Sequence, residues 1–339
     1  MNASRLPPRP PLNLPPRRRQ RGVAVITALL LTTLAVAIVA SLFWQQQVQV
    51  RSMENQRLHL QTKWILRGAL DWSTLVLDSF NSSYTSLDQP WATPLEETRL
   101  DQYIERERVE GENFDATLSG SVSDACARYN LRNLADENGR NDGQVELFKN
   151  LLTNLQLQPT LAVKVADYVA AAQPPHVVPV GDPPPPPPAP TPGGGVAGKP
   201  MSLLQADDLL AVPGFTPEMV ERLRPFVIVL PVGKTKVNVN TAPAELLAAL
   251  VGGMSVSEAS GLVARRKQAP FKNSGEFGLV LGNRTVTDPD SADVTSDWFL
   301  VASRIRLDRA ALDAEALVHR MRSGIGPGGG TRVEWIRQN

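Results

Sequence analysis

Residues 17–43 read RRRQRGVAVITALLLTTLAVAIVASLF, and this stretch decides the architecture of the chain. Arginines crowd its start, and no charged residue occurs from Val23 to Val50. The 21 residues 23–43 span about 32 Å at helical rise, which is enough to cross the hydrocarbon core of a membrane. The preceding arginines favour an amino terminus in the cytoplasm and a chain body outside it. We therefore predict a single membrane span over residues 23–43.

The border between the arginines and the apolar run admits three interpretations. A simple signal anchor needs only the apolar segment itself. A cleaved secretory signal fits less well, because its apolar region usually has about 7–15 residues and no clean cleavage site follows the run. A prepilin-type leader is cut on the cytoplasmic side after a glycine, and Gln-Arg-Gly at residues 20–22 directly abuts the run. We favour this third interpretation, with cleavage between Gly22 and Val23.

The segment after the span continues the helical pattern. From Trp44 to Phe80 there is no proline, and Gly68 is the only glycine. Apolar residues recur at helical spacing, namely at Val50, Met53, Leu58, Ile65, Leu66, Leu70 and Leu77. The pattern predicts one helix of 58 residues over Val23–Phe80, about 87 Å long. Such a helix is typical of a subunit in a fibre built from packed amino-terminal helices.

Composition and charge exclude several classes of protein. The 339 residues include one cysteine, Cys126, which excludes an internal disulfide framework and a multi-cysteine zinc site. The 35 basic and 34 acidic residues include six arginines in residues 1–22, so a chain cleaved after Gly22 has a side-chain balance of −5. This charge argues against a globally basic nucleic-acid-binding protein.

Beyond the long helix, strand patterns at both ends enclose helical patterns. Four segments fit strands by their alternation of apolar and polar residues, namely 114–122, 297–307, 314–322 and 331–337. Helical spacing instead favours 145–157 and 159–172, and we expect the charged stretch 95–110 to be partly helical. The chain is therefore expected to have an α+β fold, in which a sheet carries a helical insertion.

The insertion contains a linker of unusual composition. Residues 174–200 hold 12 prolines, which is typical of an extended, solvated segment. The expected organisation is a leader at 1–22, an amino-terminal helix at 23–80, a first part of the sheet domain at 81–124, an inserted helical domain at 125–290 and carboxy-terminal strands at 291–339.

Two segments of the insertion resemble helix-hairpin-helix units. The first contains Pro213-Gly214 before an apolar helical pattern, and the second runs from Val237 through Gly252-Gly253 to a pattern ending at Arg266. In DNA-binding versions of the unit the hairpin glycines let backbone amides approach phosphates, and nearby basic side chains add charge. Tight helical hairpins also serve as packing units, and this interpretation is the stronger one here.

The sequence contains no motif of a known catalytic site, neither a P-loop nor a Gly-x-Ser-x-Gly elbow nor a His/Cys constellation. We therefore expect no enzymatic activity. Two acidic loops offer oxygen ligands that could hold a structural calcium ion, through Asp136, Glu137, Asp288 and Asp290. Neither loop has EF-hand spacing, and such residues more often cap turns. Both interpretations stay open.

Several motifs together resemble the type II secretion minor pseudopilin K family, also called general secretion pathway protein K. They are Arg21–Leu31 (RGVAVITALLL), Arg128–Leu134 (RYNLRNL), Leu223–Pro231 (LRPFVIVLP), Val237–Leu247 (VNVNTAPAELL) and Ser296–Phe299 (SDWF). The resemblance runs from Arg17 nearly to the end of the chain. Each motif alone is weak, but their combination and order are specific.

The resemblance implies a fold, a processing step and a set of partners. It implies a pilin-like antiparallel sheet with a large helical insertion of the helix-hairpin-helix or SAM-like type. Prepilin peptidase would cut after Gly22, and Val23 would become a methylated amino terminus in the inner membrane, with a periplasmic head. The implied partners are the minor pseudopilins I and J, the major pseudopilin and the inner-membrane secretion assembly. The implied role is non-enzymatic, at the tip of the periplasmic pseudopilus.

Two positions bear on how closely the chain follows this family. Thr27 stands five places after the proposed cut, where ordinary pilin-like subunits carry a glutamate that pairs with the neighbouring amino terminus. A tip subunit has no neighbour ahead of it, so Thr27 is a marker of a tip position, although it could simply bond a carbonyl one turn earlier. The chain also lacks the further acidic residues that family members often show after the segment that here reads Ala166-Asp167-Tyr168.

Two other functions remain as alternatives. A minor pilin of a type IV pilus could share the leader and lack the glutamate, but it gives no reason for the two hairpins. A membrane-anchored DNA receptor would need the hairpin face to bind duplex DNA in a salt-dependent way.

Overall fold

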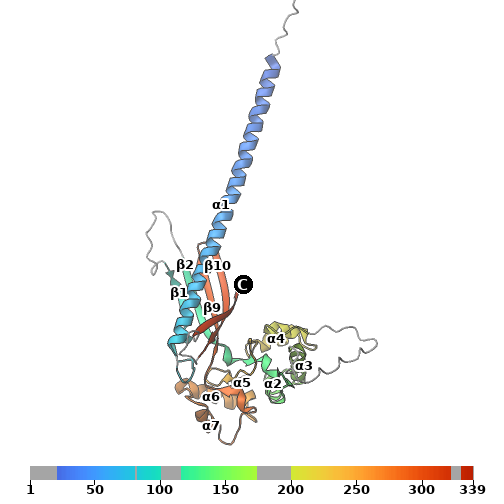
Figure 1. The fold of residues 1–339 in the computed structure, drawn as a ribbon, viewed down its shortest axis with the longest axis vertical. Coiled ribbons are helices and arrows are strands. Elements are labelled where there is room, and N and C mark those ends of the chain that lie inside the picture. Colours follow the sequence, from blue (N-terminus) through green and yellow to red (C-terminus); the bar gives the residue numbers. More distant parts are fainter. Residues whose placement is uncertain (1–20, 81, 101–115, 174–199, 322–329, 339) are drawn as a thin grey trace, which may run out of the picture. The chain divides into compact units, whose positions relative to one another are not determined.

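The structure is a computed structural model that describes residues 21–80, 82–100, 116–173, 200–321 and 330–338 (Figure 1). Contacts between residues divide the chain after Leu60 into two compact units. The expected Pro-rich linker and most of the residues between the first two strands lie outside the described residues.

A single helix, α1, runs from Arg21 to Ser79 over 59 residues. The absence of proline and the continuous apolar pattern allow it to pass without a break from the apolar segment into the second unit. In the second unit its buried stripe consists of Leu66, Leu70 and Leu77. The predicted long helix is confirmed.

The sheet has five strands in the order β1-β2-β9-β10-β11, and every pair is antiparallel. The strands are β1 (Leu95–Arg99), β2 (Ala116–Asp124), β9 (Trp298–Leu307), β10 (Ala310–Arg320) and β11 (Thr331–Gln338). A tight turn joins β9 to β10, and Asp308 adopts a positive φ of 49° there. Strands from both sides of the insertion thus join in one sheet, with β2 next to β9.

The expectation of helix in residues 95–110 is wrong for its first part. Residues 95–99 form β1, which pairs with β2 through Leu95 opposite Gly120 and Thr98 opposite Leu118. A partner strand more than 15 residues away supplies hydrogen bonds that outweigh the local preference of a charged segment. The rest of this stretch from residue 101 lies outside the described residues.

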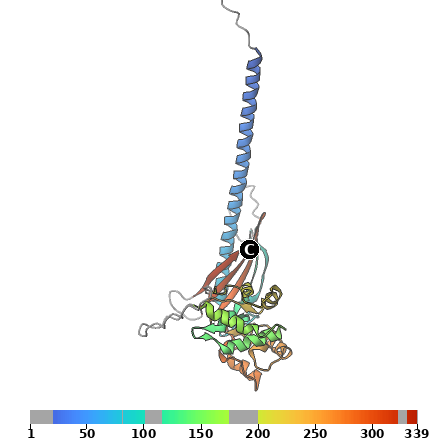
Figure 2. The same cartoon turned by 90° about the vertical axis from the view of Figure 1, so that its right-hand side faces the viewer.

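Figure 2 shows the insertion at one end of the sheet. One face of the sheet packs against α1, and the insertion covers the other face only near the start of β9, because Ala302, Arg304 and Arg306 of this strand are exposed. Successive residues of a strand point to opposite faces. Phe299 and Val301 pack against the buried stripe of α1 and contact Trp91, whose ring centroid lies 5.2 Å from that of Phe299. Trp298 and Leu300 point the other way and pack against residues of the insertion such as Cys126, Ile228 and Leu230.

The insertion between β2 and β9 has its own apolar core. Its helices are α2 (Asp142–Asn154), α3 (Leu161–Ala172), α4 (Pro217–Leu223), α5 (Ala244–Leu250), α6 (Val256–Gln268) and α7 (Ser274–Leu281). Tyr129 stacks on Phe148 in this core with ring centroids 5.5 Å apart. Short parallel pairs, β3 (Tyr129–Asn130) with β6 (Val227–Ile228) and β7 (Val237–Asn238) with β8 (Ala292–Asp293), tie its ends together.

Candidate functional site: the amino-terminal helix and its junction with the insertion

The proposed cleavage site lies at the start of α1. Gly22 and Val23 belong to the first turn of the helix, which contains no acidic residue. The Thr27 hydroxyl donates to the carbonyl oxygens of Val23, at 3.1 Å, and Ala24, at 3.0 Å. The hydroxyl is therefore satisfied within its own helix, as the alternative interpretation of Thr27 expected. The roles of Gly22, Val23 and Thr27 stay predictions.

The first part of α1 exposes its apolar side chains on all sides. Its most apolar 18-residue window has a mean hydropathy of 2.7, and none of that window is buried. Among the described residues, α1 is the one helix whose length and composition would let it cross a membrane. An apolar helix that packs against nothing in its own chain needs an apolar surrounding, either lipid or other helices.

Beyond the span, the face of α1 opposite the buried stripe carries large apolar side chains. The exposed fractions are 75% for Trp64, 52% for Trp72 and 64% for Leu75. Gly68 lies between them, and a Cβ added there would meet nothing within 4 Å. We call Trp64, Gly68, Trp72 and Leu75 the exposed face of α1. Exposed aromatic side chains of this size are typical of protein contacts.

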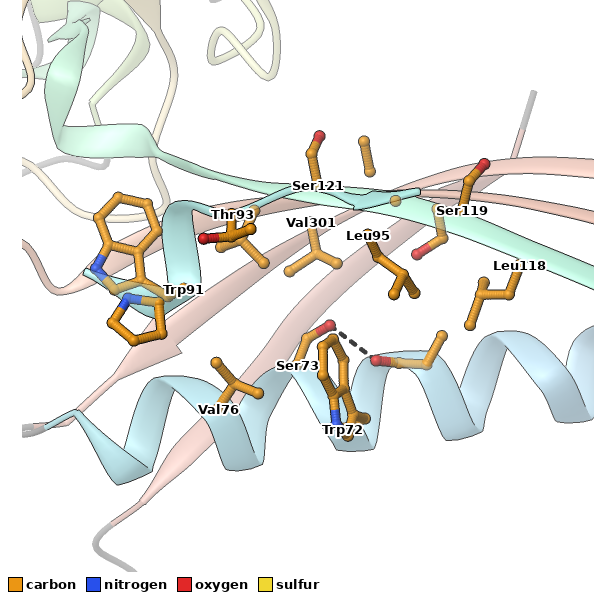
Figure 3. A pocket seen from close by; sticks show the side chains of 16 residues that line it. Trp72, Ser73, Val76, Trp91, Thr93, Leu95, Leu118, Ser119, Ser121 and Val301 are labelled. Atoms are coloured by element: carbon orange, nitrogen blue, oxygen red, sulfur yellow. Dashed lines mark hydrogen bonds between the residues drawn. The ribbon is translucent and has the colours of Figure 1, made fainter. Parts of the chain in front are cut away.

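A small hollow lies beside this face, between α1 and strands β1, β2 and β9 (Figure 3). It measures about 40 Å³, and its walls include Trp72, Trp91 and Leu95. Gly120 lies between Leu118 and Val122 on the face of β2 toward α1 and, having no side chain, leaves this space open. A hollow of this size holds a water molecule or the tip of a side chain, well below the volume of a substrate pocket.

The acidic residues predicted to bind calcium line a larger, polar cavity in the insertion. This cavity measures about 650 Å³ and includes Asp136, Asp288 and Asp290 in its walls, together with Lys234. Lys234 Nζ lies 3.9 Å from Asp136 Oδ2. Exposed Glu137 is not part of its described lining.

The carboxylates of this cavity mainly serve turns. Asp136 accepts from the backbone N–H of Asn138 at 2.8 Å. Asp288 accepts from the backbone N–H of Asp290 at 3.1 Å and from Gln144 Nε2 at 2.8 Å. Within the described residues, no group of three or more His, Cys, Asp or Glu side chains is placed to hold a metal ion. The geometry therefore favours turn capping, and the calcium site stays a prediction.

The second predicted hairpin, α5–α6, is built as a packing unit. Its Gly252 N–H donates to Thr285 O at 3.2 Å, so this amide is not free for a phosphate. The guanidinium of Arg266 is buried and donates to Val239 O at 2.7 Å, and burial lowers its pKa to about 10. Arg284 pairs with Glu258 at 2.7 Å. In a DNA-binding hairpin such amide and guanidinium groups would contact phosphates. Here these contacts bind them to other parts of the protein.

The side-chain amide of Asn240 pairs with backbone groups as a neighbouring strand would. Asn240 Nδ2 donates to Phe271 O at 2.9 Å, and Phe271 N–H donates to Asn240 Oδ1 at 2.9 Å. The next helix, α5, has Pro243 at its N-cap position and no side-chain cap, so neither Asn240 nor Thr241 caps it. Asn240 instead ties the start of α5 to the segment after α6.

The Arg128–Leu134 motif repeats this arrangement twice. Asn130 Nδ2 donates to Val232 O at 2.7 Å, while its Oδ1 accepts from Leu230 N–H at 3.1 Å. Asn133 Nδ2 donates to Thr235 O at 2.7 Å, while its Oδ1 accepts from Thr235 N–H at 3.1 Å. The two asparagines hold the segment that follows β6. Each buried side-chain amide thus has a hydrogen-bond partner for both its NH2 group and its oxygen, as buried polar groups require.

One buried residue, Asp124, has no signal in its own part of the sequence. Asp124 ends β2, is 4% exposed and accepts hydrogen bonds from three side chains. An aspartate after an alternating strand is expected in a surface turn. The available hint was the spacing of Asn and Thr in Val237–Leu247, which marks polar groups inside an otherwise apolar stretch.

Comparison with known proteins matches two consecutive parts of the insertion to one family. Family models described as "Type II secretion system (T2SS), protein K" match residues 127–232 and 237–296. The type II secretion system protein K of Pectobacterium carotovorum subsp. carotovorum is 27% identical over 324 residues, covering 89% of this chain and 93% of that protein. Its counterpart in Pseudomonas aeruginosa is 27% identical over 307 residues, covering 86% of each.

A solved structure supports the fold independently. A chain in the crystal structure of the GspK-GspI-GspJ complex from the enterotoxigenic Escherichia coli type 2 secretion system superposes with a TM-score of 0.61. The superposition covers 85% of this chain and 99% of the other at 18% identity. Matches that span the long helix, the sheet and the insertion alike leave one assignment: the chain belongs to the type II secretion system protein K family.

Proposed function

We propose that this protein K caps the periplasmic pseudopilus of a type II secretion system, together with minor pseudopilins I and J, and thereby supports export across the outer membrane. The chain is held in the inner membrane by residues 23–43, with its amino terminus in the cytoplasm and its sheet and insertion in the periplasm. Prepilin peptidase removes residues 1–22, and the new amino terminus at Val23 is methylated. The role is structural rather than enzymatic.

The observation that carries this proposal is the surface of α1. Its apolar segment is not buried by any other described part of the chain, and the exposed face with Trp64 and Trp72 lies beyond the membrane span. A subunit that joins others through its amino-terminal helix needs both features. The partners I and J are proposed because the similar solved chain comes from a complex named for K, I and J.

The tip position rests on Thr27. Its hydroxyl is bonded to carbonyl groups of its own helix, so this position offers no carboxylate to a subunit ahead of it. A buried carboxylate in the span would cost a few kcal/mol unless it were paired. A subunit with nothing ahead of it is stable without that pair.

The proposal is tested by replacing Gly22 with valine in the full-length chain expressed in its native host. We expect the precursor to stay uncleaved in the membrane and export through the system to be lost. Gly261→Ala is the control, because it changes a helical glycine of α6 where an added Cβ meets nothing within 4 Å, away from the exposed face of α1. Mass spectrometry of the wild-type protein should find an N-methylated Val23. Normal export with an uncleaved Gly22→Val chain would contradict the proposal.

A further inference from the structure

We propose that Asp124 is a positioning residue, whose buried carboxylate fixes the insertion to the sheet and to the end of α1 so that the three move as one body. The inference concerns the isolated chain and does not need the proposed function. Only its consequence for export rests on that function.

The carboxylate is a meeting point of several segments. Asp124 Oδ1 accepts from Cys126 N–H at 2.8 Å. Its Oδ2 accepts from three side chains, Ser296 Oγ at 2.5 Å, Thr241 Oγ1 at 2.6 Å and Asn238 Nδ2 at 2.9 Å. Asn238 and Thr241 belong to the insertion, and Ser296 belongs to the segment that returns to β9. One oxygen of the sheet thus holds two separate parts of the chain.

The same network reaches the segment that follows α1. Asn238 Nδ2 also donates to Thr85 O at 3.0 Å, and Thr85 N–H donates to Val294 O at 2.8 Å. Ser296 N–H donates to Thr85 Oγ1 at 3.2 Å. Thr85 is fully buried although it lies in a connecting segment. The connection between α1 and β1 is therefore attached to the junction rather than free on the surface.

Arg320 extends the network to the end of the helix. This buried residue at the end of β10 donates from Nη2 to Thr85 Oγ1 at 2.9 Å and to Ser296 O at 2.8 Å. Its Nη1 donates to Phe80 O at 3.2 Å, one residue beyond α1. A displacement of the helix end is thereby transmitted through Thr85 and Ser296 to Asn238 in the insertion.

Burying a carboxylate costs desolvation free energy that an apolar side chain in the same place would not. This cost indicates that the Asp124 carboxylate serves to orient the segments that bind it. The side chains that donate to Asp124 are all uncharged, so no cation bonded to it offsets its desolvation. Burial raises its pKa, and its hydrogen bonds counteract part of the rise. The apolar contacts of Trp298 and Leu300 with the insertion lie beside it and could join the parts without it. The carboxylate adds what apolar contacts lack, a fixed orientation.

The test measures orientation separately from folding in the purified full-length chain in detergent. Spin labels at Ala311→Cys on the sheet and Leu279→Cys on α7 report the distance between sheet and insertion. Both positions are exposed, whereas the native Cys126 is buried. We expect a narrow distance distribution that broadens in Asp124→Ala and stays narrow in the control Asp142→Asn, which changes an exposed carboxylate of the insertion.

Hydrogen exchange gives the second measurement on the same variants. In Asp124→Ala, the amides of Thr85, Cys126 and Thr241 should exchange about tenfold faster or more, because four donors lose their acceptor. The amides of α2 and of the β9–β10 pair should keep their protection. Asp124→Asn keeps one acceptor oxygen and should restore most of the narrow distribution.

Two outcomes would overturn the inference. One is an unchanged distance distribution in Asp124→Ala. The other is loss of protection throughout α2 and β9, which would mean that Asp124 only stabilises the fold as a whole. If Asp124→Ala fails to fold, the double variant Thr241→Val with Ser296→Ala removes two donors and tests the same junction. An effect of Asp124→Ala on export with an unchanged distance distribution would likewise overturn the inference, while leaving the proposed function intact.

Discussion

Asn240 and Phe271 exchange two hydrogen bonds of 2.9 Å across 31 residues of sequence, with the asparagine side chain acting as a short piece of strand. The contact joins the segment before α5 to the segment after α6, so the two helices are closed into one unit. Asn240 is buried, and its amide uses both its donor and its acceptor there.

Replacing Asn240 with alanine should destabilise the fold by about 2–3 kcal/mol, because the N–H and C=O of Phe271 lose their partners in a buried place. Chemical unfolding of the full-length chain in detergent would measure the loss. The control is Asn138→Ala, which changes an exposed asparagine in the turn between the short strands β4 (Ala135–Asp136) and β5 (Gly139–Arg140). It should alter the unfolding free energy by less than about 0.5 kcal/mol. Equal effects of both variants would contradict the role given to Asn240.

The paired amides also mark the limit of what the sequence predicts. The long helix and the outer strands follow from local patterns, because the spacing of apolar residues records which face is buried. Asn130 and Asp124 gave no local signal, since their partners lie about a hundred residues away. The segment 95–99 is a strand for the same reason, because β2 supplies its hydrogen bonds. The motifs that carry the family resemblance contain several of these residues, but their contacts join distant segments and follow only from the tertiary structure.

Two glycines of the insertion should respond in opposite directions to alanine. Gly214 has a φ of 108°, and a Cβ there would lie 2.9 Å from Leu161 Cδ2. Gly214→Ala should therefore destabilise the fold by about 1–3 kcal/mol. Gly261 lies within α6, and a Cβ there would meet nothing within 4 Å. Gly261→Ala should stabilise by about 0.5–1 kcal/mol. Thermal unfolding of both variants checks the pair, and the same sign for both would contradict this account.

The exposed face of α1 should matter for assembly rather than for folding. Trp64→Ala should change the unfolding free energy by less than about 0.5 kcal/mol, because three quarters of the side chain is exposed. Leu66→Ala, on the buried stripe, should cost about 2–4 kcal/mol. If this face contacts partners, Trp64→Ala should weaken the binding of minor pseudopilins I and J in co-purification with the full-length chain. A Trp64→Ala chain that binds both as tightly as the wild type would remove the face from the interface.

The free energy of unfolding should decrease as pH is lowered through the range in which His319 titrates. Burial lowers the pKa of His319, with Arg332 acting in the same direction and Glu334 and Asp297 opposing it. Protons therefore bind the unfolded chain more readily, so the contribution is complete above the unfolded pKa near 6.5 and is lost as pH falls below it. The ring stacks on Trp298 at 4.1 Å between centroids, so His319→Phe keeps the stack and removes the titration. Between pH 7 and 5, the unfolding free energy should change less with pH in this variant than in the wild type. An equal dependence in both chains would assign it to other groups.

Thr27 gives the sharpest separation between a tip subunit and an ordinary one. Thr27→Val removes only a hydroxyl that is bonded within its own helix, so cleavage after Gly22 and export should both persist. Thr27→Glu restores the carboxylate of ordinary pilin-like subunits. In a tip subunit no amino terminus lies ahead to pair with it, so a carboxylate in hydrocarbon costs a few kcal/mol without return. Export should then fall while cleavage continues, as measured by secreted substrate and by the mass of the mature amino terminus. Full export by Thr27→Glu would mean that a neighbour does lie ahead, and the tip position would be wrong.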